Sequence, residues 1–202
     1  RKISDKKKLK YINKVKLYKV DFDKPRSLRK VFSTIKPNLV INCIGVVKQV
    51  LNNNMNSEII RVNSFLPHYL SELINENNEI RFIHFSTDCV FSGLKGRYLE
   101  SDVTDAKDIY GVSKMLGEVD KSNNLTLRTS IIGQELKTNY SLLNWFLSQK
   151  KQIKGYKNAI FSGLTAPEIA RVIHNYVIPN KKIRGIYHLS GKPISKYDLL
   201  YI

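Results

Sequence analysis

The sequence predicts an α/β fold in which helices cover both faces of a doubly wound, parallel sheet. Short apolar runs alternate with segments of helical periodicity, and turn residues follow most of the apolar runs. The spacing leaves room for a helix between successive strands, as right-handed βαβ units require. In such sheets a ligand binds beyond the carboxyl ends of the strands. Residues that directly follow the predicted strands are therefore the first candidates for a site.

The first third of the chain predicts two strands and a helix. Residues 15–20, "VKLYKV", have the alternation of a strand. A helix is expected over 25–36, opened by Pro25, whose fixed φ suits a first helical turn. Residues 39–45, "LVINCIG", form a continuous apolar run, which is typical of a strand buried on both faces.

The middle of the chain continues the alternation. A long helix is expected over 57–77, interrupted by Pro67, and residues 80–85, "IRFIHF", predict the next strand. A helix over 109–121 and a strand over 125–130 follow.

The last third predicts helices near 141–151 and 165–177 and a strand over 185–190. The final residues, "KYDLLYI", have the pattern of a helix in its first turns. We therefore expect a chain that is cut at both ends.

Composition excludes several classes of protein. At 202 residues and 42% hydrophobic, the chain is long enough for one large domain, with or without a small appendage. No apolar run approaches the roughly 18–20 residues of a membrane helix, so no membrane partner is expected. Two cysteines, Cys43 and Cys89, do not make a disulfide scaffold, which favours a reducing, cytoplasmic setting.

The net charge of +17 invites a nucleic-acid interpretation, which we do not favour. Lysines outnumber arginines by 25 to 9, a usage bias rather than an arginine-rich surface. Residues 1–36 carry 14 basic and 3 acidic residues, or +11 of the +17. The excess is either a solvated basic face or a positive field that gathers an anionic ligand such as a nucleotide.

One pair of residues stands at a helix start. In "YGVSK", Tyr110 and Lys114 are four apart and so project from one helix face. Such a pair arises by chance about once in a chain of this composition, so it is informative only in context. The context is a strand that ends in "STD" 23 residues earlier, counted from Thr87 to Tyr110.

Several motifs in order resemble the extended short-chain dehydrogenase/reductases, and most closely the dTDP-4-dehydrorhamnose reductases and related nucleotide-sugar reductases. The matching pieces are "VDFD" (20–23), "INCIGVVKQ" (41–49), "VNSFLPHYL" (62–70), "FSTDCVFSG" (85–93), "YGVSKMLGE" (110–118) and "LTLRTSIIG" (125–133).

The resemblance implies a Rossmann-like sheet whose first strand, glycine-rich turn and first helix would precede residue 1. Residues 1–133 would form an incomplete NAD(P)-binding core. Residues 134–202 would form part of a substrate-binding portion, interleaved with the last core strands and also truncated.

The resemblance also assigns roles in catalysis. Tyr110 would be the general acid, Lys114 would lower the pKa of the phenol and bind the nicotinamide ribose, and Thr87 would hydrogen-bond the substrate oxygen. A turn or helix cap is the plainer role for Thr87 and its neighbours. The substrate contacts that the family implies are Thr87, Asp88, Cys89, Arg128, Ile131 and Trp145. No metal is expected.

For the cofactor, expected to be NADPH with NADH possible, the implied contacts are Asp21, Phe22, Cys43, Ile44, Gly45, Asn63, Ser86, Tyr110 and Lys114. Arg1 and Lys2 could end the segment that reads the adenosine 2′-phosphate, although terminal charges are usually just solvated. Asp21 could instead be a turn residue before the Pro25 helix. Asn63 could equally be a buried polar group at the kink before Pro67.

Two departures bear on the substrate. Related dehydratases carry Glu where this chain has Cys89, so plain carbonyl reduction is favoured over water elimination. The rhamnose-pathway enzymes carry Trp where this chain has Ile131, so Trp145 or Phe161 is a candidate to supply a sugar-facing aromatic ring. A lone Trp is more often part of a core. Arg128 faces either the nucleotide phosphates or an internal acidic partner.

The expected function is NAD(P)H-dependent reduction of the 4-keto group of a nucleotide-linked deoxysugar in surface polysaccharide biosynthesis. Alternatives on the same scaffold are a nucleotide-sugar epimerase and a non-catalytic, dinucleotide-binding regulatory subunit. A homodimer is possible, and no nucleic-acid partner is expected.

Overall fold

The computed structural model describes residues 14–21, 24–48, 56–76, 80–135 and 139–201. The chain falls into two units, residues 1–37 and 38–202.

In the first unit, the predicted helix is confirmed as α1, Pro25–Ile35. It ends where Lys36 takes a left-handed conformation and donates its backbone N–H to the Phe32 carbonyl. The strand predicted over residues 15–20 is wrong, since residues 16–21 have no regular secondary structure. A strand is held by a neighbouring strand, and in the described part of the chain this segment pairs with none.

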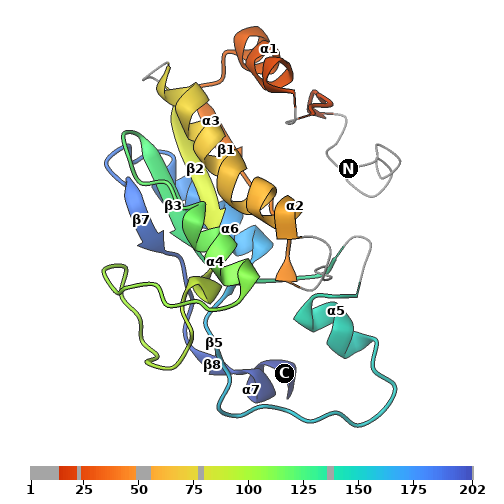
Figure 1. The fold of residues 1–202 in the computed structure, drawn as a ribbon. Coiled ribbons are helices and arrows are strands. Elements are labelled where there is room, and N and C mark those ends of the chain that lie inside the picture. The colour runs from red at the N-terminus through yellow and green to blue at the C-terminus, as the bar shows by residue number, and fades with distance from the viewer. Residues whose placement is uncertain (1–13, 22–23, 49–55, 77–79, 136–138, 202) are drawn as a thin grey trace. The chain divides into compact units, whose positions relative to one another are not determined.

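The second unit is built on a parallel sheet, as predicted (Figure 1). Its four strands are β1, Leu39–Asn42; β2, Arg81–Ser86; β3, Asn124–Arg128; and β7, Gly185–His188. They lie in the order β1-β2-β3-β7, and every neighbouring pair is parallel. Because the strands run the same way, Asn42, Ser86 and Arg128 reach the same edge of the sheet.

Strand β1 is shorter and less buried than the sequence predicted. The ladder ends at Asn42, three residues before the expected end, and Ile41 is 41% exposed. The expectation of a strand buried on both faces is therefore wrong, because β1 is an outer strand of the described sheet. After Asn42 the chain turns, and the Asn42 side-chain oxygen accepts the Ile44 backbone N–H at 3.1 Å.

One face of the sheet is covered by the long helix predicted over 57–77 (Figure 1). It comprises α2, Asn56–Ile60; a π-helical segment, Arg61–Phe65; and α3, Leu66–Asn75. The predicted interruption is confirmed, since the Leu66 N–H bonds to Arg61 five residues back, directly before Pro67. Pro67 has no N–H to give to the Asn63 carbonyl, so the wider turn forms there.

Helix α4, Ile109–Leu116, packs beside the π-helical segment on this face. It stops five residues earlier than predicted, at Gly117. A Cβ atom added to Gly117 would lie 1.9 Å from the Asn63 carbonyl oxygen, so the two backbones touch there. Only glycine permits this approach.

The opposite face is covered by α6, Ala166–Val172, which continues as a π-helical segment over Ile173–Val177. A hydrophobic core joins it to β2 and β3 through Ile83, Leu125, Leu127, Ile169, Ile173 and Val177. The Arg81 guanidinium donates to the carbonyl oxygens of Ile178, at 3.2 Å, and Ile183, at 2.8 Å. Helices on both faces agree with the predicted doubly wound sheet.

Four short strands, which periodicity did not reveal, lie beyond the sheet edge. Strand β4, Ile131–Ile132, pairs with β6, Leu164–Thr165, and β5, Ile160–Phe161, pairs with β8, Ile194–Ser195. The helix predicted near 141–151 is present but shorter, as α5, Leu142–Leu147, and the helix predicted in the final residues is α7, Lys196–Tyr201. The division at residue 133 stays a prediction.

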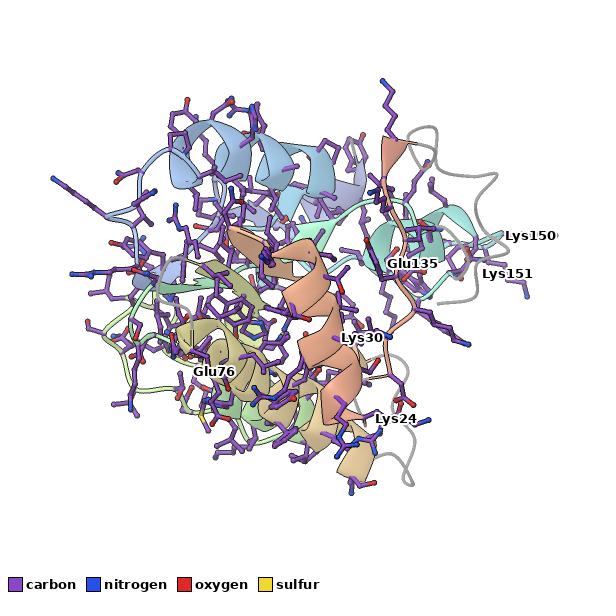
Figure 2. The ribbon with its side chains drawn as sticks, turned by 90° about the horizontal axis from the view of Figure 1, so that it is seen from above. Lys24, Lys30, Glu76, Glu135, Lys150 and Lys151 are labelled. Atoms are coloured by element: carbon purple, nitrogen blue, oxygen red, sulfur yellow. The ribbon has the colours of Figure 1, made fainter. Side chains whose placement is uncertain are left out.

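Part of the positive charge lies on exposed lysine side chains, whereas Lys114 and Arg128 are each 5% exposed. Figure 2 labels Lys24, Lys30, Lys150 and Lys151, and all four are exposed. In the part of the chain that the structure describes, no helix has the length and apolar character needed to cross a membrane.

We expect Gly117→Ala to lower the free energy of unfolding by about 1–3 kcal/mol, because the added methyl group would overlap the Asn63 carbonyl. Urea unfolding measures this change. Gly133→Ala is the control, since its Cβ would meet nothing within 4 Å. Equal stability of the two variants would contradict the close contact.

Candidate active site

The candidate site begins where β2 ends. Thr87 follows the strand and caps a single 3₁₀ turn, Asp88–Val90, by accepting the Cys89 N–H at 3.2 Å. The plainer role that we considered for Thr87, a cap, is therefore present. The Thr87 side chain is 6% exposed. Its hydroxyl also donates to the Asp88 carboxylate at 3.2 Å.

Helix α4 brings Tyr110 to Thr87. The Asp108 carboxylate caps the helix by accepting the N–H groups of Tyr110 and Gly111, each at 3.1 Å. A Cβ at Gly111 would lie 2.4 Å from the Cys89 carbonyl, so the helix start presses directly on the 3₁₀ turn. The Thr87 hydroxyl acts on the Tyr110 phenol, whose pKa it lowers. Two of the three predicted catalytic groups therefore lie close together.

The pKa of the Tyr110 phenol lies above its ordinary value, mainly because burial disfavours the phenolate. The Thr87 contact lowers it, while Cys89, Asp88 and Asp108 raise it further. The sequence predicted a pKa lowered by Lys114, and in this structure the net direction is the opposite. The phenol is consequently held in the protonated form, which a proton donor needs.

Lys114 lies one helical turn from Tyr110 and is 5% exposed. Its ammonium donates to the Phe85 carbonyl at 2.6 Å, at the end of β2. Burial lowers the pKa of Lys114 to about 8, and the charge of Glu118 acts in the opposite direction. The third predicted catalytic group therefore lies on the same helix face, joined to the strand that carries Thr87.

A buried histidine near Lys114 was not predicted from the sequence. His84 is fully buried in β2, and its Nδ1 accepts the Asn42 amide at 3.1 Å. Burial and the nearby Lys114 charge lower the pKa of His84 to about 2, so it is neutral. Its Nε2 has no hydrogen-bond partner among the described residues. The signal in the sequence was a polar residue inside the apolar run "IRFIHF".

Asn63 serves the turn after β1. Its amide accepts the Val46 N–H at 2.8 Å and donates to the Val46 carbonyl at 3.0 Å and to Ser113 at 3.1 Å. These contacts match the alternative that we raised, a buried polar group at the helix kink.

The turn that holds Cys43, Ile44 and Gly45 is open on one side and fixed on the other. Ile44 is exposed, and Gly45 adds no side chain to the surface. The buried amides of Asn42 and Asn63 hold the backbone from below. The backbone of this turn is held from one side by hydrogen bonds and is exposed on the other, so these residues leave room for a dinucleotide.

Arg128 has an internal partner rather than a free guanidinium. It forms a two-pronged ion pair with Glu118, at 2.8 and 2.7 Å, and both side chains are less than 10% exposed. Ser86 donates to the same carboxylate at 2.8 Å, and the Phe91 ring lies 5.1 Å from the guanidinium. The alternative of internal pairing is what the structure shows for Arg128. The Ser86 hydroxyl is likewise engaged, because it donates its proton to Glu118.

Asp88 links the ends of two strands. Its carboxylate accepts Thr87 Oγ1 at 3.2 Å and Ser130 Oγ, from the end of β3, at 2.6 Å. The Cys89 thiol lies 3.6 Å from the same carboxylate, and burial raises the pKa of this thiol. Asp88 and Cys89 therefore lie beside Thr87, and their substrate contacts stay a prediction.

The side chains predicted to face the sugar differ in their exposure and in their distance from the end of β3. Ile131, directly after Ser130, is 56% exposed. A Cβ at Gly163 would lie 2.3 Å from both the Phe161 ring and the Ser130 carbonyl, so Phe161 packs near this edge. Trp145 lies on α5 and is partly exposed. Of the two candidate aromatic side chains, Phe161 is the one that the structure connects to Ser130.

The predicted adenine contacts belong to the first unit. The Asp21 carbonyl accepts the Lys24 N–H at 3.1 Å, as in a turn before α1. Phe22, Arg1 and Lys2 lie outside the described residues.

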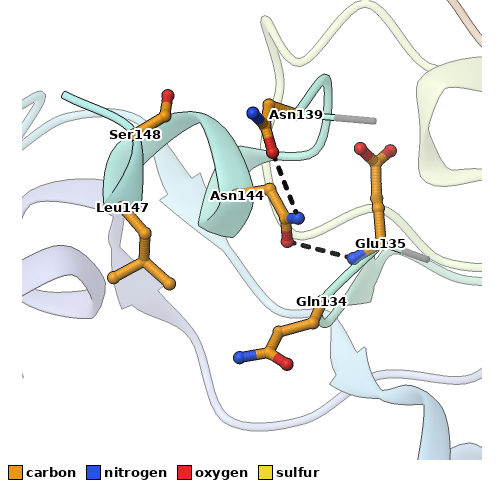
Figure 3. Close-up of a pocket in the computed structure, with 6 residues that line it drawn as sticks. All are labelled: Gln134, Glu135, Asn139, Asn144, Leu147 and Ser148. Atoms are coloured by element: carbon orange, nitrogen blue, oxygen red, sulfur yellow. Dashed lines mark hydrogen bonds between the residues drawn. The ribbon is translucent and has the colours of Figure 1, made fainter. Parts of the chain in front are cut away.

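A separate pocket of about 220 Å³ lies beside α5, between this helix and Gln134, Glu135 and Asn139 (Figure 3). The Glu135 N–H donates to Asn144 at 3.0 Å, and this bond closes one side of the pocket. Its lining residues are Gln134, Glu135, Asn139, Asn144, Leu147 and Ser148. None of the predicted site residues lines it. Among the described residues, no three His, Cys, Asp or Glu side chains could together hold a metal ion.

Comparison with protein families identifies one match, the RmlD substrate binding domain, over residues 1–200. Among curated proteins, the chain is 28% identical over 179 residues to dTDP-4-dehydrorhamnose reductase of Aggregatibacter actinomycetemcomitans, covering 83% of this chain and 60% of that protein. It is 24% identical over 192 residues to methionine adenosyltransferase 2 subunit beta of Danio rerio, covering 86% and 57%.

Solved structures show the same fold. A hypothetical dTDP-4-dehydrorhamnose reductase from Sulfolobus tokodaii matches with a TM-score of 0.78 and 24% identity, covering 91% of this chain and 66% of that one. The dTDP-4-dehydrorhamnose reductase of Bacillus anthracis, solved with NADP, matches with a TM-score of 0.77 and 19% identity, covering 90% and 66%. The resemblance predicted from the motifs is confirmed.

We expect Glu118→Leu to destabilise the fold by about 3–5 kcal/mol, because it leaves the Arg128 guanidinium buried without its partner. Adding Arg128→Met in the same chain should restore most of the loss. The free energy of unfolding in urea measures both effects. A double variant no more stable than Glu118→Leu would contradict the view that the loss arises from an unpaired Arg128 guanidinium.

Because burial lowers the pKa of Lys114, we expect the stability of the fold to rise with pH. The pKa of Lys114 is about 8 in the folded chain and near 10.4 when unfolded, so between these values the unfolded chain binds more protons. The free energy of unfolding should rise over this window in the wild type, relative to Lys114→Met. Exposed Lys107→Met is the control and should show the wild-type slope. Parallel curves for wild type and Lys114→Met would contradict a buried ammonium.

Proposed function

Because this chain belongs to the RmlD substrate binding domain family, we propose that it reduces the 4-keto group of a nucleotide-linked deoxysugar with NAD(P)H, in surface polysaccharide biosynthesis. The observation that supports this most is the convergence of Tyr110, Thr87 and Lys114 at the carboxyl edge of a parallel sheet. The chain spans about 60% of the length of the first curated relatives that it matches. The activity of the whole protein is therefore part of the proposal.

We propose NADPH as the cofactor, with NADH as a second option, since one of the matching structures holds NADP. When bound, NADPH supplies a hydride to the carbonyl carbon. Lys114 and Tyr110 would hold the ribose, and the turn at Cys43, Ile44 and Gly45 would lie along the cofactor. Ser86 and Asn63 would contribute through backbone or supporting contacts, and the cofactor contact of Asp21, which belongs to the first unit, stays a prediction.

Tyr110 donates the proton to the substrate oxygen in this proposal. Its raised pKa keeps the phenol protonated before the reaction. The Lys114 ammonium, fixed by the Phe85 carbonyl, supplies positive charge on the same helix face while phenolate character develops. Thr87, which acts on the phenol from the end of β2, would hydrogen-bond the same substrate oxygen.

Cys89 favours reduction over dehydration. Water elimination needs a further base beside the reacting carbons, and dehydratases place a Glu at this position. Burial raises the pKa of the Cys89 thiol, so it stays neutral and is a poor base. The exposed Ile131 and the nearby Phe161 would present an apolar surface to the sugar.

Two alternatives remain on this scaffold. The similarity to methionine adenosyltransferase 2 subunit beta favours a regulatory subunit, which would bind dinucleotide without turnover. An epimerase would purify with tightly held NAD and return the hydride to its substrate. The cytoplasmic setting and the homodimer stay predictions.

The test is NADPH consumption by the full-length protein with a panel of 4-keto nucleotide sugars. We expect turnover with at least one sugar, and Tyr110→Phe should lower kcat by about 10²–10⁴-fold, because the proton donor is lost. Absorbance at 340 nm follows the reaction.

The control for this experiment is cofactor affinity, measured by fluorescence titration, which Tyr110→Phe should change far less than kcat. Absence of turnover together with tight dinucleotide binding would favour the regulatory subunit. Turnover that Tyr110→Phe leaves unchanged would contradict the assignment of the proton donor.

A further inference from the structure

We propose, on the basis of the function proposed above, that His84 is a positioning residue for the cofactor. Through Asn42 it would fix the turn at Cys43, Ile44 and Gly45, along which the dinucleotide would lie. His84 is fully buried in β2 and would touch neither cofactor nor substrate. Its effect passes through two hydrogen bonds, one from the Asn42 amide to the ring and one from the Ile44 N–H to the Asn42 amide. The roles that the family resemblance assigns fall on neither His84 nor Asn42.

The orientation of the Asn42 amide follows from the backbone of the turn. The Ile44 N–H is a donor, so the Asn42 atom that faces it at 3.1 Å must be the oxygen. The other end of the amide carries two N–H donors, and it points to His84, 3.1 Å from Nδ1. A flipped amide would set donor against donor at Ile44. The backbone of the turn therefore allows only one orientation of Asn42.

The same reasoning assigns the proton on the imidazole ring. Because the Asn42 nitrogen donates, Nδ1 must accept, and a neutral histidine then carries its proton on Nε2. A charged ring would bring an N–H at Nδ1 against the N–H groups of Asn42. Burial and the nearby Lys114 charge act in the same direction, since they lower the pKa of His84 to about 2. His84 is thus a neutral acceptor whose lone pair faces Asn42.

The ring of His84 is well suited to be the fixed end of these two bonds. His84 and Asn42 are paired neighbours in the parallel register of β2 and β1, and their exposed fractions are 0% and 3%. The fully buried Phe82 ring lies 6.3 Å from the His84 ring, with the two planes 22° apart. Strand β2 is an inner strand of the described sheet, whereas β1 is an outer one. The turn after β1 is therefore held from the better supported strand.

Asn63 does not replace this connection. It holds Val46, the residue after the turn, by two hydrogen bonds to the Val46 backbone. Asn42 holds Ile44, in the middle of the turn. The Ile44 side chain is 59% exposed, so its own packing contributes little. Loss of the acceptor on His84 should let the Asn42 amide turn away from Ile44 and loosen the middle of the turn, while its far end stays attached.

The experiment compares His84→Asn with His84→Leu in the full-length protein, by fluorescence titration with NADPH. Asparagine places a side-chain oxygen near the position of Nδ1 and can accept from Asn42, although it fills less space than leucine. We expect His84→Leu to raise the Kd for NADPH by about 10-fold, because a buried N–H group loses its acceptor, and His84→Asn to raise it by less than about 3-fold. A role in packing alone gives the reverse order, since asparagine leaves the larger cavity, and that order would overturn the proposal.

A matched control separates positioning from a general loss of stability. Asn124→Ala also removes a buried side-chain hydrogen bond, to Ser71 at 2.6 Å, but at the amino end of β3, on the opposite edge of the sheet. It should lower the free energy of unfolding and leave the Kd for NADPH unchanged. If Asn124→Ala weakens NADPH binding as much as His84→Leu does, the positioning role is overturned.

A second variant serves if His84→Leu does not fold. Asn42→Ala removes the same two bonds from the outer strand β1 and should raise the Kd for NADPH by about 10-fold as well. With the active sugar, either variant should raise the KM for NADPH far more than it lowers kcat, because the reacting groups are unchanged. A fall in kcat at an unchanged KM would overturn the proposal.

A further measurement needs neither cofactor nor turnover. Nitrogen NMR of the imidazole rings reports the charge and the tautomer of each histidine, and the signal that His84→Leu or His84→Asn removes belongs to His84. From about pH 5 to about pH 8 this ring should stay neutral, with its proton on Nε2. A ring that is charged in this range, or that carries its proton on Nδ1, overturns the arrangement of the two hydrogen bonds.

The outcomes keep this proposal and the proposed function apart. If wild type binds NADPH without turnover while the two His84 variants differ as expected, the proposed reduction fails and the positioning role stands. If wild type reduces the sugar while His84→Leu binds NADPH as wild type does, the positioning role is overturned and the proposed reduction stands. A wild type that binds no dinucleotide overturns both.

Discussion

The site depends on the close approach of α4 to two segments: the 3₁₀ turn at Asp88–Val90 and the π-helical segment at Arg61–Phe65. Glycine at each end of the helix allows it: Gly111 lies against the Cys89 carbonyl and Gly117 against the Asn63 carbonyl. Any side chain at either position would push the helix outward. Because Lys114 lies between these two contacts and Tyr110 lies directly before the first, their distance from the end of β2 is set by backbone contact and not by adaptable side chains. Thr87 can then face the phenol.

Beneath this helix, the sheet face is unusually polar for a core. His84, Ser86 and Arg128 are buried there, and each has a buried partner: Asn42 for the histidine, Glu118 for the other two. An apolar core of the same volume would hold the sheet equally well. The polar groups fix positions instead, since each bond joins the end of one strand to the next strand or to the chain after α4. The edge that presents Thr87 is consequently rigid.

Elements with strong periodicity could be predicted from the sequence, and their junctions could not. Helix α1 and strand β2 matched within one residue, because each carries its own pattern and start signal. The end of α4 was missed, since it depends on contact between Gly117 and a residue 54 positions earlier. Tyr110, Thr87 and Lys114 were found through their order along the chain. The partner of Arg128 was left open, because residue types alone do not say which carboxylate a guanidinium meets across the fold.

The π-helical segment before α3 holds one residue more than an α-helical turn would need. Loss of a single residue between Ile60 and Leu66 would return the segment to ordinary α-helical winding and remove the wider turn that holds Asn63. Asn63 would then swing away from Val46, and the loop after β1 would lose its anchor. This stretch should therefore tolerate exchange of its side chains far better than any change in its length.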